Sequence, residues 1–141
     1  MTINQFMTND HRSCDEQFAQ LENIVDNGNF EGAGVMFEEF HTHMLKHFDM
    51  EEQVLFEEFN SANCEGCNPT GMMIMEHDQM RNLMSQMNQA IQAKKKDQFL
   101  GLSENLLFVM QQHNMKEEQI MYNLADDALD SASIIDKMQE V

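Results

Sequence analysis

The sequence is poor in the residues that build sheets and disulfide frameworks. It has one proline (Pro69), no tryptophan and few β-branched residues, which argues against a sheet. Its three cysteines are an odd number, and this fits a reduced compartment better than a set of disulfides. The opening stretch MTINQFMTND has neither the basic nor the apolar region of a signal peptide, and no run of about 18 apolar residues follows. We therefore expect a cytoplasmic protein.

Positive charge is also scarce. Eight Lys and Arg residues stand against 25 Asp and Glu residues, for a formal net charge of −17. A nucleic-acid-binding protein needs a basic surface, which so few cations cannot provide. An anionic membrane surface would repel the chain for the same reason. We expect partners that are neither nucleic acids nor membranes.

The residues that are abundant favour helices. Methionine (15) and phenylalanine (10) dominate an apolar fraction of 42%, and apolar residues recur at steps of three and four. Thr8 is a candidate N-cap, Gly28 a candidate helix end and Thr70 a further N-cap. The pattern predicts a single domain, residues 1–141, with helices at about 8–27, 30–59, 70–93 and 97–127 and a short one at 131–139. Short connections between long helices predict an all-α, antiparallel up-down-up-down four-helix bundle.

Each predicted helix carries an apolar stripe that should face the core. In the helix predicted at 8–27 the stripe comprises Cys14, Phe18, Leu21 and Val25. In the helix predicted at 97–127 it comprises Leu102, Leu106, Met110, Ile120 and Leu124.

The two halves of the chain repeat each other at an offset of 66 residues without gaps. The stretch HFDMEEQVLF, which starts at His47, reappears as HNMKEEQIMY, which starts at His113, and the acid before the first histidine reappears as Asp10 and Glu76. One copy of the helix pair therefore reads as a histidine followed later by His-x-x-x-Glu. The paired positions are His11 with His77, His47 with His113, and Glu51 with Glu117.

This spacing has a direct structural meaning. Residues four apart lie on the same helix face, so His47 and Glu51 point the same way, as do His113 and Glu117. Because these residues sit within apolar stripes, their burial would cost several kcal/mol without partners. A two-metal site satisfies all six groups, and nitrogen and oxygen donors without thiolate suit iron or manganese more than structural zinc. We expect two iron ions, with manganese as the alternative.

These motifs resemble the hemerythrin-like, or HHE cation-binding, family. The resemblance rests on DH at residue 10, HFxxEExxxF at 47, EHxxxR at 76 and HxxxEExxxY at 113, and it covers residues 8 to 127. It implies a four-helix bundle around a carboxylate-bridged di-iron centre, oxo- or hydroxo-bridged. One iron would be held by His11 and His47 and the other by His77 and His113. Glu51 and Glu117 would bridge the two irons.

The sequence departs from the oxygen-carrying hemerythrins. The positions four before and four after His77 are Met73 and Arg81, so a fifth histidine is missing, and the bridging residue of the last helix is Glu117 rather than aspartate. The pattern resembles the four-histidine, two-glutamate branch, which implies reaction with a small ligand (nitric oxide, peroxide or oxygen) in stress defence or iron-centre repair. The alternatives are oxygen or redox sensing, oxygen storage, and iron storage with a redox or iron-acceptor protein as partner.

Several other residues keep two interpretations. His43 is a partner of the metal ligands or a histidine with a local hydrogen bond. Tyr122 could donate a hydrogen bond at the site, although packing is its favoured role. Arg81 pairs with Asp15 or with a carboxylate near the site. Cys64-x-x-Cys67 is a redox pair, a zinc site shared with another chain, or an incidental pair, which we favour.

Overall fold

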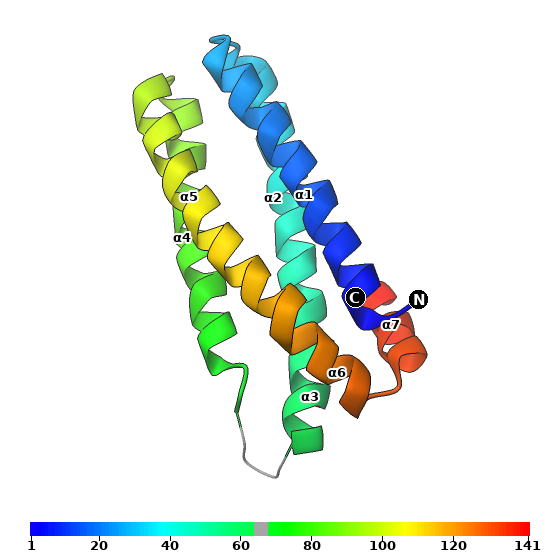
Figure 1. Ribbon diagram of the computed structural model, residues 1–141. Coiled ribbons are helices and arrows are strands. Elements are labelled where there is room, and N and C mark those ends of the chain that lie inside the picture. Colours follow the sequence, from blue (N-terminus) through cyan, green and yellow to red (C-terminus); the bar gives the residue numbers. More distant parts are fainter. Residues whose placement is uncertain (64–67) are drawn as a thin grey trace.

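The computed structural model describes residues 1–63 and 68–141, and every regular element in these ranges is a helix (Figure 1). The Cys64 and Cys67 pair lies outside the described residues. In chain order the elements are α1 (Ile3–Asp26), α2 (Phe30–Met50), the π-helical turn η1 (Glu51–Leu55), α3 (Phe56–Asn63), α4 (Gly71–Gln92), α5 (Lys96–Lys116), the π-helical turn η2 (Glu117–Met121), α6 (Tyr122–Ala128) and α7 (Ser131–Gln139).

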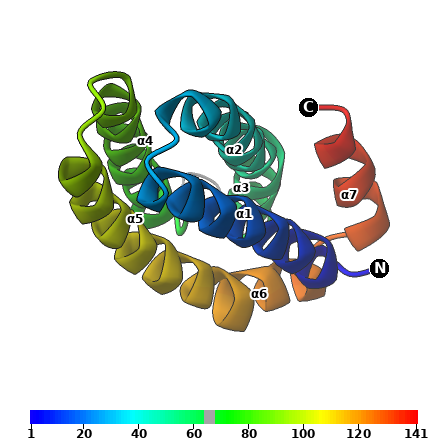
Figure 2. The ribbon, with the colours of Figure 1, turned by 90° about the horizontal axis from the view of Figure 1, so that it is seen from above.

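Four long rods form the bundle. They are α1, α2 with its continuation η1–α3, α4, and α5 with its continuation η2–α6. Viewed from above, α1 packs against α2 and α5, and α4 packs against the same two helices (Figure 2). Consecutive rods run in opposite directions (Figure 1). The predicted all-α, up-down-up-down four-helix bundle is therefore confirmed.

The long second and fourth rods are each interrupted by one π-helical turn. The turns begin at Glu51 and Glu117, which are equivalent positions of the internal repeat. A π turn uses i→i+5 hydrogen bonds, so it inserts one residue into the α-helical period. Every later side chain then faces a different direction from the one that uninterrupted α periodicity predicts.

This shift overturns part of the predicted core stripe. Ile120 and Leu124 are 59% and 50% exposed, so their assignment to the core is wrong. The next residues along the chain, Met121 and Ala125, are buried instead. The stripes before the turns face the core as predicted: Leu102 is partly buried, and the buried members are Cys14, Phe18, Leu21, Val25, Leu106 and Met110.

The first helix begins earlier than predicted. Thr2, not Thr8, is its N-cap, because Thr2 and Gln5 form a reciprocal capping box. Asp126 of α6 adds a second cap, and its two carboxylate oxygens accept hydrogen bonds from the backbone N–H groups of Ile3 and Asn4 at 2.7 and 3.1 Å. These contacts fasten the start of α1 to the last rod of the bundle.

The two helix pairs end their first helices in the same way. Gly28 follows α1 with φ of +76°, and Lys94 follows α4 with φ of +55°; the two positions are equivalent in the repeat. At each end the backbone folds back in a Schellman arrangement, with Gly28 N–H donating to Val25 and Lys94 N–H donating to Ile91. Gly28 ends its helix as predicted, whereas Lys94 adopts a left-handed conformation that a side chain disfavours.

Thr70 precedes α4 as predicted, but its side chain does not cap the helix. The Thr70 hydroxyl donates instead to Oδ1 of Asn60 at 3.1 Å, and the residue is buried. It therefore ties the start of α4 to α3.

The apolar core is divided into two clusters. One contains Phe18, Phe40 and Leu106 and fills the end of the bundle at which the two helix pairs turn. The other contains Leu55 and Tyr122 and lies near the two chain termini. In sequence, each of the four rods passes from one cluster to the other through a buried histidine.

Helix α7 closes the second cluster from outside the four-rod ring (Figure 2). It packs beside α1 and η1 and buries Ile134, Ile135 and Met138. It occupies the range in which the sequence predicts a short terminal helix. None of the described helices combines the length and hydropathy that a membrane crossing requires.

Candidate metal centre

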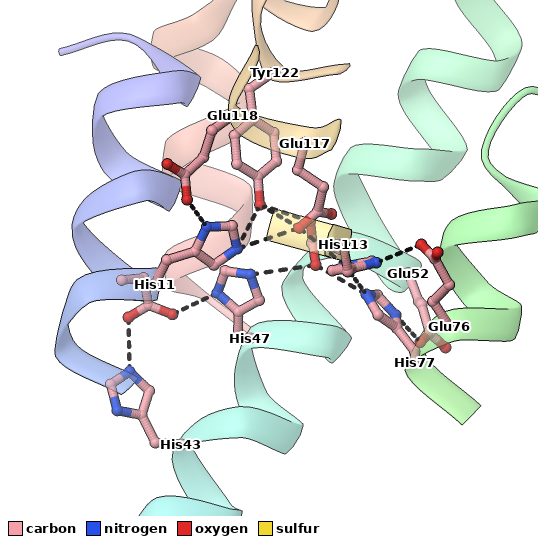
Figure 3. A network of polar contacts seen from close by, with 12 residues as sticks. His11, His43, His47, Glu52, Glu76, His77, His113, Glu117, Glu118 and Tyr122 are labelled. Carbon is pink, nitrogen blue, oxygen red and sulfur yellow. Dashed lines mark hydrogen bonds and ion pairs between the residues drawn. The ribbon is translucent and has the colours of Figure 1, made fainter. Parts of the chain in front are cut away.

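All six predicted ligand side chains converge between the two apolar clusters. Figure 3 shows the four histidines and Glu117 pointing toward one another. None is more than 4% exposed. Their nitrogen and oxygen atoms form two overlapping groups in which every atom lies within 4.8 Å of the others. The groups share Glu117: one contains His11 and His47, and the other contains Glu51, His77 and His113.

The histidines form two pairs, as the repeat predicts. The ring centroids of His11 and His47 are 4.6 Å apart, and those of His77 and His113 are 4.8 Å apart. One histidine of each pair comes from the first helix of its half, and the other from the second helix. Each of the four rods therefore contributes one imidazole, and each half of the chain supplies one histidine pair.

Each glutamate contacts one histidine from each pair. Oε1 of Glu51 lies 3.3 Å from Nε2 of His47 and 3.1 Å from Nε2 of His77. Oε1 of Glu117 lies 3.2 Å from Nε2 of His11 and 3.0 Å from Nε2 of His113. The two carboxylates therefore connect the histidine pairs, which is the position of a bridging ligand.

The centre contains buried polar atoms without hydrogen bonds. Within the described ranges these atoms include Nε2 of His47, Oε1 of Glu51 and Oε2 of Glu117. Two of them, Nε2 of His47 and Oε1 of Glu51, lie 3.3 Å apart and form an ion pair only when the histidine is protonated. A bound cation would satisfy all three atoms, which burial otherwise makes costly. Imidazole nitrogens and carboxylate oxygens at these positions fit iron or manganese, and the residues present therefore suit the metal that the sequence predicts.

Every one of the four histidines has a carboxylate behind it. The outward ring nitrogen, Nδ1, faces an acidic side chain, while Nε2 faces the centre (Figure 3). This arrangement fixes the ring orientation and the tautomer of a metal-binding histidine. The Nδ1-to-oxygen distances are 2.7 Å for His11 with Glu118, 2.6 Å for His47 with Asp10, 2.6 Å for His77 with Glu52, and 2.9 Å for His113 with Glu76.

Sequence reasoning missed the role of these four outer carboxylates. The signal was present, because the acids are repeat-equivalent: Asp10 matches Glu76, and Glu52 matches Glu118. Asp10 and Glu76 each orient a histidine of their own half, whereas Glu52 and Glu118 each orient a histidine of the other half. Glu52 of the first half orients His77 of the second, and Glu118 of the second half orients His11 of the first.

Each π turn brings the residue five positions after its glutamate to the side of the helix that faces the centre. In a π turn the residue five positions later returns to nearly the same side of the helix. Tyr122 is five residues after Glu117, and its hydroxyl donates to Oε1 of that glutamate at 3.0 Å. Phe56 is five residues after Glu51, and its ring stacks with His77 at a centroid distance of 5.7 Å.

Tyr122 is a member of the centre, not only a packing residue. Its hydroxyl lies 2.8 Å from Oε2 of Glu51 and 3.2 Å from Nε2 of His11, and the side chain is fully buried. Burial raises the pKa of the phenol well above its usual value, and the charges of Glu117 and Glu51 raise it further. The group is therefore held as a neutral phenol whose single proton is shared between the carboxylates of Glu51 and Glu117.

The surrounding charges set the protonation of the centre. Burial alone would lower the pKa of His47, but the charge of Glu51 and the hydrogen bond with Asp10 raise it to about 10. Burial would likewise lower the pKa of His113, which Glu117 raises to about 9. Burial alone would raise the pKa of Glu51, but the charge of His47 together with hydrogen bonds with Glu117, His47 and His77 holds it well below its usual value. Without a cation, His47 and His113 therefore hold protons and Glu51 keeps its negative charge.

His43 and Cys14 lie beside the centre. His43 bonds to Oδ1 of Asp10 through Nε2 and to Gln17 through Nδ1, so it contacts an outer carboxylate and none of the six predicted ligands. Cys14, Asp10 and His43 form a further group of potential donor atoms, but Asp10 and His43 already bond to each other. Burial raises the pKa of the Cys14 thiol, which keeps it protonated.

Arg81 pairs with a carboxylate near the site. Its guanidinium bonds to Glu52 at 2.6 Å and to Asp78 at 2.8 Å, so the alternative pairing with Asp15 is wrong.

One of three comparisons with known proteins identifies a family. No curated protein and no solved structure matches the chain. The model of the hemerythrin HHE cation-binding domain matches residues 2–125, a range that includes all six converging side chains and the four outer carboxylates. The chain therefore belongs to the hemerythrin HHE cation-binding domain family.

Proposed function

We propose that the protein holds two iron ions and uses them to bind and react with a small molecule such as nitric oxide, peroxide or oxygen. One ion would be held by His11 and His47 and the other by His77 and His113. Glu51 and Glu117 would bridge them. The observation that carries the proposal is that each buried glutamate contacts one histidine from each pair.

The ligand count leaves room for such a molecule. Two imidazoles and one oxygen from each glutamate give each ion four protein ligands, and iron commonly takes up to six. When bound, the irons would supply electrons and Lewis acidity to a molecule in the remaining positions. The surroundings restrict the size of that molecule, because none of the six side chains is more than 4% exposed.

The chain's own groups would hold and orient the centre. The outer carboxylates keep each imidazole turned inward. Tyr122 holds a proton beside Glu51, Glu117 and His11, the only hydroxyl that the described contacts place there. Phe48 and Phe56 stack with His77 at 4.1 and 5.7 Å and exclude water from that side.

The first test is metal content. Iron-loaded protein should contain two irons per chain and show near-ultraviolet absorption, which zinc cannot produce. Glu51→Gln should lose at least one iron, whereas Glu39→Gln, an exposed change on the same rod, should keep both. Wild-type protein that binds fewer than two irons would contradict the proposed centre.

The second test is reactivity. Reduced protein is mixed rapidly with nitric oxide and, separately, with peroxide, and oxidation of the centre is followed by absorption. Repeated turnover with either supports an enzyme. A reversible spectral change with oxygen and no turnover would support the alternative, a sensing or storage module for which the small and buried centre is equally suited. Loss of iron to an apo-acceptor protein would instead indicate iron delivery.

A further inference from the structure

The outer carboxylates of the two proposed metal positions differ in their own partners. We call the position between His77 and His113 the second-half position. Its carboxylates are Glu52 and Glu76, and each is paired with a permanent cation. Glu52 bonds to Arg81 at 2.6 Å, and Glu76 bonds to Lys116. Arg81 also bonds to Asp78, an exposed carboxylate, at 2.8 Å. The two cations therefore neutralise part of the negative charge behind these two histidines.

The position between His11 and His47, the first-half position, lacks this arrangement. In the described ranges neither Glu118 nor Asp10 forms an ion pair with a lysine or an arginine. Asp10 bonds to His43, and the Glu118 carboxylate bonds only to His11 among the side chains of residues 1–63 and 68–141. The histidines of this position therefore lie against carboxylates whose charge is less compensated.

The internal repeat shows which residues replace the missing cations. The counterpart of Arg81 is Asp15, and the counterpart of Lys116 is Met50. Asp15 and Glu118 line the same surface cavity, and Glu118 is the carboxylate that orients His11, so Asp15 lies near the first-half position. One cation has thus been exchanged for an anion and the other for an apolar side chain.

The neighbouring rings strengthen the difference. His77 lies between Phe48 and Phe56, and the Arg81 guanidinium lies 5.1 Å from the Phe48 ring centre. The counterparts of these two rings in the other half are Asn114 and Tyr122, which are polar. Phe48 and Phe56 offer no polar atom to the second-half position, whereas the Tyr122 oxygen lies 3.2 Å from Nε2 of His11 in the first-half position.

We propose that the two metal positions are electrostatically unequal, so that the first-half position binds a divalent cation more tightly and holds the more oxidised iron when the two irons differ in charge. The physical reason is that uncompensated carboxylates stabilise a nearby cation, while Arg81 and Lys116 offset the same effect at the second-half position. This inference rests on the proposed two-metal centre and adds an order of filling to it.

The test uses variants that keep one position each. His113→Ala leaves the first-half pair intact, and His47→Ala leaves the second-half pair intact. Metal is first stripped from both variants with a chelator, which is then removed. The dissociation constant for Mn²⁺ is measured by calorimetric titration at low ionic strength. We expect His113→Ala to bind Mn²⁺ at least about tenfold more tightly, which is the range in which outer-shell groups change metal affinity. Equal affinities, or the reverse order, would overturn the inference.

A surface variant tests the cause without removing a ligand. Asp15→Arg, in the His113→Ala background, places a cation beside Glu118 as Arg81 stands beside Glu52. Because Asp15 is exposed, the change should be tolerated by the fold. The Mn²⁺ affinity should fall several-fold at low salt and less in 1 M salt, where exposed charges are screened beyond about 3 Å. Glu39→Arg makes the same change in net charge on another exposed surface and should have little effect.

The outcomes separate this inference from the proposed function. Wild-type protein that binds no metal would remove both. Two ions in the wild type with indistinguishable one-position variants would leave the metal centre in place and remove only the inequality. Unchanged affinity in Asp15→Arg, with a tenfold difference between the two one-position variants, would contradict the role given to Asp15.

Discussion

The hydroxyl of Tyr122 donates to Oε2 of Glu51 at 2.8 Å, although the two residues lie 71 positions apart in the chain. The same hydroxyl donates to Glu117 at 3.0 Å, so a single phenol contacts both carboxylates that connect the histidine pairs. Its counterpart in the first half is Phe56, which has no hydroxyl. Only the second half therefore supplies a hydroxyl at this position, and it reaches a glutamate from each half.

Tyr122→Phe should destabilise the metal-free protein and leave metal content unchanged. The substitution removes the hydrogen bonds to two buried carboxylates, and we expect a loss of about 1–3 kcal/mol in unfolding free energy. Urea denaturation of chelated protein measures the loss, and metal analysis of loaded protein checks that Tyr122 is not a required ligand. A variant as stable as the wild type after chelation would show that the phenol is not needed by the carboxylates.

Metal removal should lower thermal stability. The cation satisfies buried imidazoles and carboxylates that are otherwise left facing one another, so binding to the folded chain contributes folding free energy. At a free metal concentration of 100 times the dissociation constant the gain is about 2.7 kcal/mol. Thermal melts with and without chelator measure it, and addition of excess Mn²⁺ after chelation should restore the melting temperature. Identical melts would argue against a buried site.

The stability of the metal-free protein should fall at alkaline pH. The pKa of His47 is raised to about 10 and that of His113 to about 9, both above the unfolded value of about 6.5. A raised pKa means that the folded state binds the proton more tightly, so the stabilisation is complete below about pH 6.5 and is lost as pH rises through 9 to 10. Denaturation of chelated protein between pH 6 and pH 10 tests this. Stability that rises over this interval would contradict the protonation described.

Asp126→Ala should weaken the start of α1. The carboxylate caps the N–H groups of Ile3 and Asn4 and also accepts from the Ser131 hydroxyl at 2.7 Å. Loss of a helix N-terminal cap costs about 0.5–2 kcal/mol, and we expect a value in the upper half of that range because two amides lose their partner. Asp127→Ala is the matched control, since Asp127 is exposed and has no such bonds among the described contacts. Equal losses in the two variants would refute the cap.

Lys94→Gly should stabilise the fold. Lys94 has φ of +55°, a conformation that a side chain makes unfavourable and glycine adopts freely. After the entropy cost of glycine in the unfolded chain, we expect a gain of about 0.5–1 kcal/mol. The reciprocal change, Gly28→Lys, should cost a similar amount at the equivalent turn, where nothing within 4 Å of a new Cβ would add a clash. Stability changes of the same sign in both variants would contradict this explanation.

Sequence periodicity was sufficient for the rods and for the inward direction of the candidate ligands. Steps of three and four residues place Phe18, His47 and Glu51 on core faces, and burial agrees at each position. The repeat then predicts that the histidines and glutamates of both halves share one site, because buried polar residues that recur in register need a common partner.

The same periodicity could not predict the π turns. An extra residue in one helical turn does not change the composition of the segment. The structure reveals it by the exposure of Ile120 and Leu124, which α-helical periodicity places in the core. The role of Tyr122 depends on that turn, since ordinary α-helical spacing would direct it away from Glu117. The start of α1 was predicted too late because the cap from Asp126 comes from a segment 122 or more residues away.

The exchange of orienting carboxylates between the halves makes each helix pair incomplete by itself. Glu52 steadies a ring in the second pair, and Glu118 steadies one in the first. A fragment that contained only one pair would keep two imidazoles but would leave one of them free to rotate. Such a fragment could regain the missing carboxylate only by associating with the other helix pair. The two pairs therefore depend on each other as the subunits of an obligate dimer do, within one continuous chain.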